Sequence, residues 1–482
     1  MEDCQKRVPA EFILGQIRYR YQTLAEAFGT GWVDILLLFL FNILFLVAAF
    51  IKFNKYDVRY ERKETMLKSI IRKEILNNLL SYKFSIIIIL STILILVSIF
   101  VMYRDYCLAL ENYESIQSKS DYPHPMAIIR PTPLAIFAKG LEENICRSHE
   151  GDDGEIKVSS KPQSLNNIFK LFTTPDLLYI IKVILSLCAM LFAFDMVSGE
   201  KEIGTLRQSL SCNLKRPVLI IGKWIGGFTS FILPFFIAVL LGTIFVTLSP
   251  MVDINVQNWE KLGLFLLSSV LYLAIFFSLG LLISCLTHQS SSSLVISLFV
   301  WTIFVFLIPN LGNILARQLV RIPTVQQLEL KRELNRSWLM IERNRADDSQ
   351  RREIYNRFRA ENEKHTEDYR NRLNRLVTVS QNITRFSPAA AFTFLATDIA
   401  GTGMAEERSS KSAVVLYFDI LGDWDLEKWS QPGFSYQRFS YQRCSIKEVL
   451  YQGGLGNCLI LILFNILFFA GAYVAFLRYD VR

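Results

Sequence analysis

Residues 84–103 read FSIIIILSTILILVSIFVMY, twenty consecutive residues without a charged side chain. A transmembrane helix needs about 20 mostly apolar residues to cross the hydrocarbon core of a bilayer. Six further apolar runs of comparable length lie at residues 33–53, 177–197, 224–248, 262–286, 294–311 and 458–477. The sequence therefore predicts an all-α polytopic membrane protein.

The composition of the whole chain agrees with this prediction. Hydrophobic residues make up 51% of the 482 residues and charged residues only 20%, whereas soluble proteins average about 25% charged. Eight cysteines are too sparse for a disulfide scaffold. The net charge of +8 follows from basic flanks of the apolar runs and from a charged loop, so we expect no nucleic-acid binding.

Lysine and arginine are concentrated in residues 52–83 and 198–223. Cytoplasmic loops carry such an excess, so both segments are predicted to be cytoplasmic. With seven crossings, the N-terminus is then outside and the C-terminus cytoplasmic, in an inner or plasma membrane. Residues 104–176 and 312–457 are predicted to be extracytoplasmic.

The second of these outer segments has an unusual composition. From Thr324 to Ser387 it contains no glycine or proline, and its apolar residues recur at helical spacing. This pattern predicts two long helices that turn near Asp347, Asp348 and Ser349. Two interpretations stay open: a solvated spacer without further function, or a domain that acts on a partner.

The first and last apolar runs repeat each other. FNILF at 41–45 recurs at 464–468, and YDVR at 56–59 recurs at 479–482. A duplication explains both matches, and it predicts a six-span unit over residues 60–482 with one extra span in front. The predicted divisions are 1–59 (extra span), 60–103 (interfacial elbow helix and first core span), 104–176 (outer loop), 177–311 (core spans two to five with the cytoplasmic loop 198–223), 312–457 (outer helical domain) and 458–482 (last span and tail).

The cytoplasmic loop carries the most specific motif. Residues 195–207 read DMVSGEKEIGTLR, which predicts a span leaving the bilayer, a charged turn and a short amphipathic helix. Gly204 permits the tight turn, Thr205 is placed to cap the helix, and Leu206 with Leu210 forms an apolar face. Such a face suits a groove on a partner protein.

Glycines follow at the start of the next span. Gly222, Gly226 and Gly227 are predicted to let this helix pack closely against its neighbours. The basic stretch before residues 84–103 has a stripe of Leu67, Ile71, Ile75 and Leu79, as expected of a helix at the membrane interface.

The motif resembles a known family. SGEKEIGTLR, followed by Arg-Pro at 216–217 and Gly-Lys at 222–223, is similar to the transmembrane subunits of ABC-2-type transporters. The branch that it resembles contains permeases associated with multi-copper-enzyme maturation and gliding motility. RPTPL at 130–134, and Ser387-Pro388 through the Gly-Thr-Gly of 401–403, add to a resemblance that extends from about residue 60 to the end.

The resemblance implies a cytoplasmic coupling element that docks on a separate ATP-hydrolysing subunit. The residues that it assigns to coupling are Glu200, Lys201, Glu202, Gly204, Thr205, Leu206 and Arg207. It further implies a homodimer, or a heterodimer with a second permease, surrounded by membrane lipid.

The chain itself has no Walker A motif and no other catalytic motif. We therefore expect a permease subunit that is not an enzyme, with ATP and Mg²⁺ held by the partner ATPase and with export of an unidentified substrate. The alternative is a non-transporting scaffold that transmits ATPase-driven motion to an extracytoplasmic partner.

Soft metal ligands occur in the first outer loop. His124, Met126, Cys146 and His149 are residue types that bind copper, but only the last two are closely spaced. A disulfide between Cys107 and Cys146 is the better supported alternative. We expect no metal site and no cofactor in this chain.

Overall fold

The computed structural model describes residues 61–119, 126–152, 155–159, 175–211, 214–345, 348–421 and 438–479. The chain divides into two units, Met1–Lys55 and Tyr56–Arg482. All described residues belong to the second unit. The predicted span at 33–53 and its repeat of the last span therefore lie outside the described residues.

Within the described part of the chain, six helical segments are long and apolar enough to cross a membrane. They coincide with the six core spans predicted from the sequence, so an all-α polytopic membrane protein is confirmed. The segments are α4 (Tyr82–Lys119), α7–η2–α8–α9 (Leu177–Tyr179, Ile180–Leu185, Ser186–Ala193 and Ser198–Ile203), α11 (Arg216–Thr247), α12 (Val256–Leu286), α13–η3–α14 (Ser290–Thr302, Ile303–Leu307 and Ile308–Leu319) and α20–η4–α21 (Ile446–Val449, Leu450–Gly454 and Leu455–Arg478).

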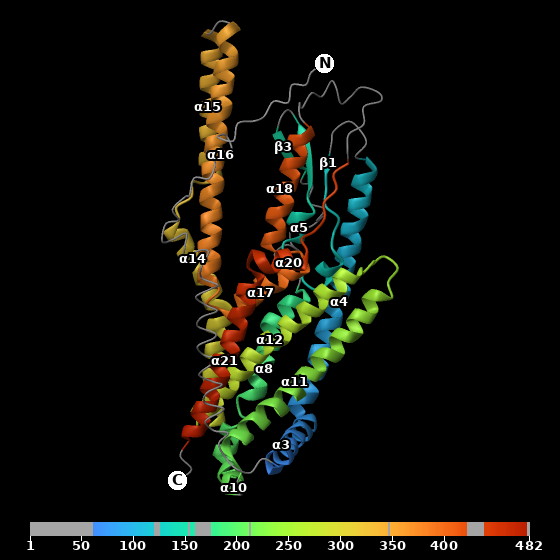
Figure 1. Cartoon of the computed structure of the whole chain (residues 1–482), viewed down its shortest axis with the longest axis vertical. Coiled ribbons are helices and arrows are strands. Elements are labelled where there is room, and N and C mark those ends of the chain that lie inside the picture. The colour runs from blue at the N-terminus through green and yellow to red at the C-terminus, as the bar shows by residue number, and fades with distance from the viewer. Residues whose placement is uncertain are drawn as a thin grey trace, which may run out of the picture. The chain divides into compact units, whose positions relative to one another are not determined.

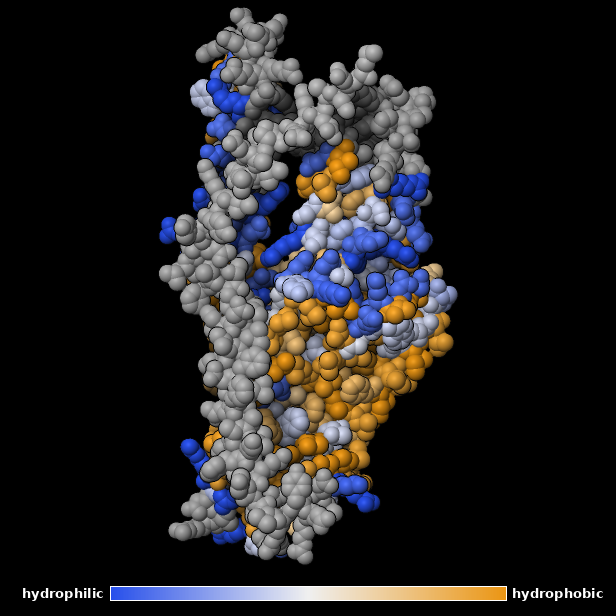
Figure 2. All heavy atoms as spheres, in the orientation of Figure 1, coloured by the Kyte–Doolittle hydropathy of each residue, from blue (hydrophilic) through white to orange (hydrophobic). Residues whose placement is uncertain are grey.

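Figure 2 shows the result on the surface, where an apolar band crosses the molecule with polar residues at its borders. The segments η2, η3 and η4 are π-helical, a local widening that single-turn bulges introduce into long helices. Two of the spans follow each other closely, because α12 ends at Leu286 and α13 begins at Ser290.

Helix α12 lies at the centre of the bundle and is its most buried span. It packs against α21, α8 and the short apolar helix α17 (Pro388–Ala400). The Tyr272 ring of α12 stacks on the Phe392 ring of α17 with centroids 4.4 Å apart. Ser387 caps α17 by accepting hydrogen bonds from the N–H groups of Ala389 and Ala390.

The predicted polar helical hairpin is confirmed. Helices α15 (Val325–Arg345) and α16 (Asp348–Thr384) pack side by side, as Figure 1 shows, and Arg357 of α16 forms an ion pair with Glu342 of α15. Helix α15 ends at Arg345 and α16 begins at Asp348, and residues 346–347 between them lie outside the described residues.

The first outer loop contains structure that the sequence did not predict. Strands β1 (Met126–Ala127), β2 (Ser148–Asp152) and β3 (Glu155–Ser159) form an antiparallel sheet in the order β1-β2-β3. The last residue of β2, Asp152, pairs with the first residue of β3, Glu155. The short helices η1 (Pro133–Ile136) and α5 (Glu142–Ile145) lie between β1 and β2 in the sequence, and α18 (Met404–Leu421) packs against α5.

This outer region is held by one buried ion pair. The Arg443 guanidinium donates to both carboxylate oxygens of Glu142, at 3.0 and 2.7 Å, and to the carbonyl of Gly401. Gly401 has φ +72°, and the next residue, Thr402, donates to the carbonyl of Ala138. The Gly-Thr-Gly stretch of 401–403 thus ties the second outer segment to the first.

Candidate functional site

The motif in the loop that was predicted to be cytoplasmic forms two short helices joined at one glycine. Helix α9 (Ser198–Ile203) ends at Gly204, whose φ of +84° is left-handed and favours glycine. Helix α10 (Thr205–Ser211) follows directly. We refer to residues 198–211 as the α9–α10 element, and its predicted tight turn at Gly204 is confirmed.

The predicted cap at Thr205 is wrong. Thr205 is the first residue of α10, and its hydroxyl donates to the carbonyl of Glu200 at 3.5 Å. The N–H groups of Arg207 and Gln208 instead donate hydrogen bonds to the carbonyl of Gly204. The left-handed glycine therefore ends α9 and also provides the first acceptor of α10.

The predicted docking face of α10 needs correction. Leu206 is only 1% exposed, and Leu210 packs beside it. Both contribute to a cluster with Val197, Ile220 and Phe476 from three other helical segments. The apolar face of α10 is thus covered by the protein's own bundle, because the loop folds back beneath the spans. Leu206 anchors the element and is not available to a partner.

Glu200 belongs to a buried ion triad. The Lys223 ammonium of α11 lies 2.7 Å from a Glu200 oxygen and 3.1 Å from a Glu74 oxygen, and its side chain is 3% exposed. Glu74 lies on α3 (Glu61–Leu79), the helix before the first described span. The triad therefore joins α3, α11 and the α9–α10 element. This pairing was not predicted, because Glu74 and Lys223 are 149 residues apart in the sequence.

Lys201 also points inward. Its ammonium donates to the carbonyls of Cys285 and Thr287, at 2.5 and 3.0 Å, where α12 ends. It lies over the Tyr479 ring at 4.7 Å from the centroid, a cation–π contact. Lys201 therefore satisfies carbonyls at the C-terminus of a helix, where cations are favoured.

Glu202 reaches the start of the following helix. Its carboxylate accepts hydrogen bonds from the N–H and the hydroxyl of Ser290, at 3.0 and 2.8 Å. A carboxylate at a helix N-terminus satisfies free N–H groups and complements the helix dipole. Glu202 thereby links the α9–α10 element to α13.

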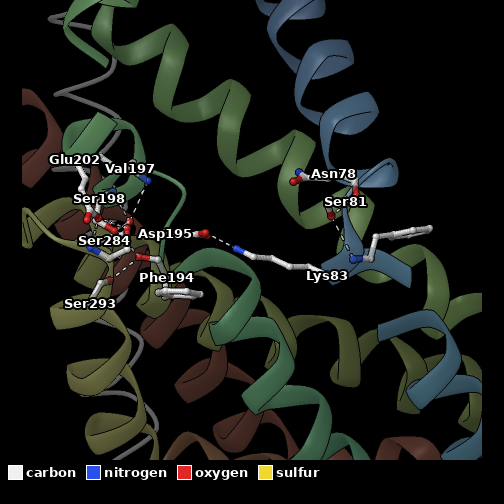
Figure 3. A network of polar contacts seen from close by, with 12 residues as sticks. Asn78, Ser81, Lys83, Phe194, Asp195, Val197, Ser198, Glu202, Ser284 and Ser293 are labelled. Atoms are coloured by element: carbon white, nitrogen blue, oxygen red, sulfur yellow. Dashed lines mark hydrogen bonds and ion pairs between the residues drawn. The ribbon is translucent and has the colours of Figure 1, made fainter. Parts of the chain in front are cut away.

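A serine network reinforces this link (Figure 3). The Ser284 hydroxyl of α12 accepts from the N–H groups of Val197 and Ser198 at 3.0 and 2.9 Å. Ser293 of α13 donates to the carbonyl of Phe194 at 2.6 Å. In the same view Asp195 forms an ion pair with Lys83 of α4. The residues just before the element, together with Ser198, are therefore attached to α4, α12 and α13.

The side of the α9–α10 element that faces away from the bundle is exposed. Four of the residues assigned to coupling are exposed, namely Glu202, Gly204, Thr205 and Arg207. Ile203 joins them with 78% of its surface accessible. Ile203 was not predicted as a contact residue, because the apolar contact was assigned to Leu206. Its position directly before the turn glycine was the available indication.

The predicted close approach of the glycines is confirmed. A Cβ atom on Gly222 would lie 2.6 Å from the Ile70 side chain, and one on Gly226 would lie 2.7 Å from Cβ of Glu74. Gly227 faces Met196 and Phe277 in the same way. The absence of side chains at these positions lets α3 pack against α11, which brings Glu74 within reach of Lys223.

The first outer loop gives no metal site among the described residues, since no group of three or more His, Cys, Asp or Glu side chains is placed to hold an ion. His124 lies outside the described residues. Cys107 and Cys146 are free thiols, so the disulfide considered from the sequence is not formed. Burial and the nearby Glu142 carboxylate raise the pKa of Cys146 well above its usual range, which disfavours the thiolate that metals bind.

Comparison with known proteins identifies the family of this chain. The sequence model of the family described as "ABC-2 family transporter protein" matches residues 32–481. The chain belongs to the ABC-2 family of transporter proteins. The match begins upstream of residue 60, where the resemblance was expected to start, so it includes the first apolar run. Membership supports a multi-pass, non-catalytic transmembrane subunit of an ABC transporter.

A curated protein of Stutzerimonas stutzeri, named "Probable ABC transporter permease protein NosY", is 26% identical over 155 residues. The matched segment is 32% of this ABC-2 family chain and 52% of the relative, so this chain spans about half the length of the relative that it matches.

Proposed function

We propose that this chain is the permease subunit that couples ATP hydrolysis on a separate ATPase subunit to export of a substrate across the membrane. One observation carries the proposal. The α9–α10 element exposes Ile203 at its tip, while its base is bonded to several spans. A partner that moves this tip would move those spans with it.

The contact that we propose is made by the exposed side of the element, with Glu202, Ile203, Thr205 and Arg207 against the ATPase. An exposed isoleucine flanked by one acidic and one basic residue supplies both apolar area and charge recognition. Glu200, Lys201 and Leu206 act as positioning residues, because their side chains are engaged within the bundle. ATP and Mg²⁺ belong to the partner subunit in this proposal.

A dimer of permease subunits is the second part of the proposal. In the span Ser290–Leu319 only 17% of the most apolar window is buried, and in Tyr82–Gln117 only 22%. Such surfaces contact lipid or another membrane subunit. They leave room for a second copy of the chain or for a sibling permease, with the α9–α10 element on the cytoplasmic side of an inner or plasma membrane.

The test is co-purification of the ATPase with the full-length chain from native membranes. Ile203→Asp should abolish recovery of the ATPase and leave the permease in the membrane. Ile420→Asp is the matched control, since Ile420 lies on α18 in the outer region and is 75% exposed, against 78% for Ile203. Equal recovery of the ATPase with both variants would refute the assigned contact.

A non-transporting scaffold remains the second candidate function. The observation in its favour is an exposed apolar stripe on the otherwise charged α15, formed by Leu330, Leu334, Trp338 and Ile341. A soluble extracytoplasmic protein could bind this stripe and be moved by the ATPase. ATP-dependent flux in reconstituted vesicles favours transport, whereas ATP-dependent motion of the hairpin without flux favours the scaffold.

A further inference from the structure

A basic groove lies where the hairpin meets the fifth described span. It has a volume of about 610 Å³ and is formed by the end of α14 and the lower part of α16. Its lining residues are Gln318, Leu319, Val320, Arg321, Asp368, Asn371, Arg372 and Arg375. Three guanidinium groups therefore face one carboxylate, and the groove has a net positive charge.

The two helices are fixed against each other next to the groove. Ser380 of α16 donates to the side-chain oxygen of Asn313 of α14 at 2.6 Å. One turn further toward the membrane, a Cβ atom on Gly312 would lie 2.5 Å from the Thr384 side chain. The close approach of α14 and α16, visible in Figure 1, makes the groove a built feature of the fold.

The charges in the groove are only partly balanced. Asp368 accepts from Arg372 of the same helix at 3.0 Å. Arg321 and Arg375 are exposed and form no ion pair with any residue in the described ranges. Two guanidinium groups are thus free to bind an anion, and their planar donors match phosphate oxygens.

The groove directly follows the end of an apolar span. The span that includes α14 ends at Leu319, and its last turns expose Ile314, Leu315 and Leu319 by 54%, 44% and 71%. Arg321 follows two residues later. A bilayer whose hydrocarbon covers these side chains places its phosphate groups beside the guanidinium groups.

We propose that this groove is a binding site for an anionic phospholipid. Its phosphate lies between Arg321 and Arg375, and its acyl chains run along Leu315 and Leu319 of α14. The lipid would join the outer end of this span to α16 and hold the base of the hairpin at the membrane surface. The site is separate from the α9–α10 element, and the proposal does not depend on transport.

The test measures lipid retention by the delipidated full-length chain in detergent, using native mass spectrometry. Dioleoylphosphatidylglycerol should bind the unmodified chain more tightly than dioleoylphosphatidylcholine does. The double variant Arg321→Gln/Arg375→Gln should weaken the phosphatidylglycerol complex by roughly 30-fold, since each basic residue near an anionic surface contributes about fivefold in affinity. Leu319→Ser should weaken it too, because the acyl contact is lost.

The matched control is Arg336→Gln/Arg370→Gln. It removes two exposed arginines of the same hairpin that do not line the groove, so it should retain the lipid. Equal lipid loss in both double variants would mean nonspecific attraction and would overturn the site, as would full retention by Arg321→Gln/Arg375→Gln. If inorganic phosphate displaces the lipid and binds equally to Leu319→Ser, the ligand is a soluble anion and the lipid assignment is wrong.

Discussion

Replacing Lys223 by methionine tests whether the buried ion triad holds the α9–α10 element in place. Methionine has a similar length and no charge, so the cavity stays filled while the ammonium is lost. The carboxylates of Glu74 and Glu200 then face each other in a buried site without their shared counter-ion. We expect α3 and the α9–α10 element to separate.

The magnitude follows from the geometry. The two carboxylate oxygens lie 3.1 and 2.7 Å from the Lys223 nitrogen, so they are at most about 6 Å apart. At an effective dielectric constant of 20 their repulsion is about 3 kcal/mol. This agrees with the 3–5 kcal/mol typical of a buried ion pair that loses one partner, and it should lower the unfolding temperature on the order of 10 °C.

Thermal unfolding in detergent, followed with a thiol-reactive dye, measures the loss. Cys285 is 5% exposed at the end of α12 near Lys201 and becomes reactive when this region opens. Lys68→Met is the control, because it removes an exposed lysine of α3 and should change the unfolding temperature little.

Adding Glu74→Gln and Glu200→Gln to Lys223→Met should recover most of the lost stability, since no unpaired charge then stays buried. The reasoning is refuted if Lys223→Met unfolds at the temperature of the unmodified chain. It is refuted equally if the triple variant unfolds as early as the single one.

Three further variants test burial elsewhere. Burial raises the pKa of Asp398 to about 6, above roughly 3.9 in the unfolded chain. The contribution of Asp398 to stability is therefore full below about pH 4 and is lost as the pH rises through 6. Differential scanning fluorimetry should show that Asp398→Asn raises the unfolding temperature at pH 7.5 and not at pH 4. Gly226→Val places Cβ 2.7 Å from a side-chain carbon of α3 and should cost about 1–3 kcal/mol, whereas Gly263→Val, with no atom within 4 Å of its Cβ, should cost little. Leu206→Ala should cost about 2–5 kcal/mol of stability, and Leu248→Ala, at an 80% exposed position, should cost much less. Equal unfolding temperatures within the glycine pair or within the leucine pair would contradict the assigned contacts.

The spans and the hairpin were predictable because their information is local. Hydropathy over about 20 residues locates a span, and the absence of glycine and proline between Thr324 and Ser387 indicates long helices. The glycines at 222 and 226 also predicted a close approach, although not that α3 is the neighbour. The small sheet was missed because its strands are short and include polar residues such as those of Ser148–Asp152.

The candidate site was predictable in its position and not in its orientation. The motif placed the turn at Gly204 correctly, and the periodicity found the apolar face with Leu206. Periodicity shows which residues share a face and not which neighbour covers it. The bundle itself covers Leu206, and Ile203 is left exposed. The pairing of Lys223 with Glu74 depends on the tertiary fold, which one sequence does not reveal.

Helix α4 is longer than a membrane crossing requires. Its 38 residues give a rod about 57 Å long, whereas the hydrocarbon core is about 30 Å thick. Near its base, Lys83 is ion-paired with Asp195 just before the α9–α10 element, and farther along α4 packs against η1 of the outer region. A rigid rod that pivots at its base by 10° moves its far end by about 10 Å. A small rotation of α4 at one membrane face would thus produce a large displacement of its far end beyond the other face.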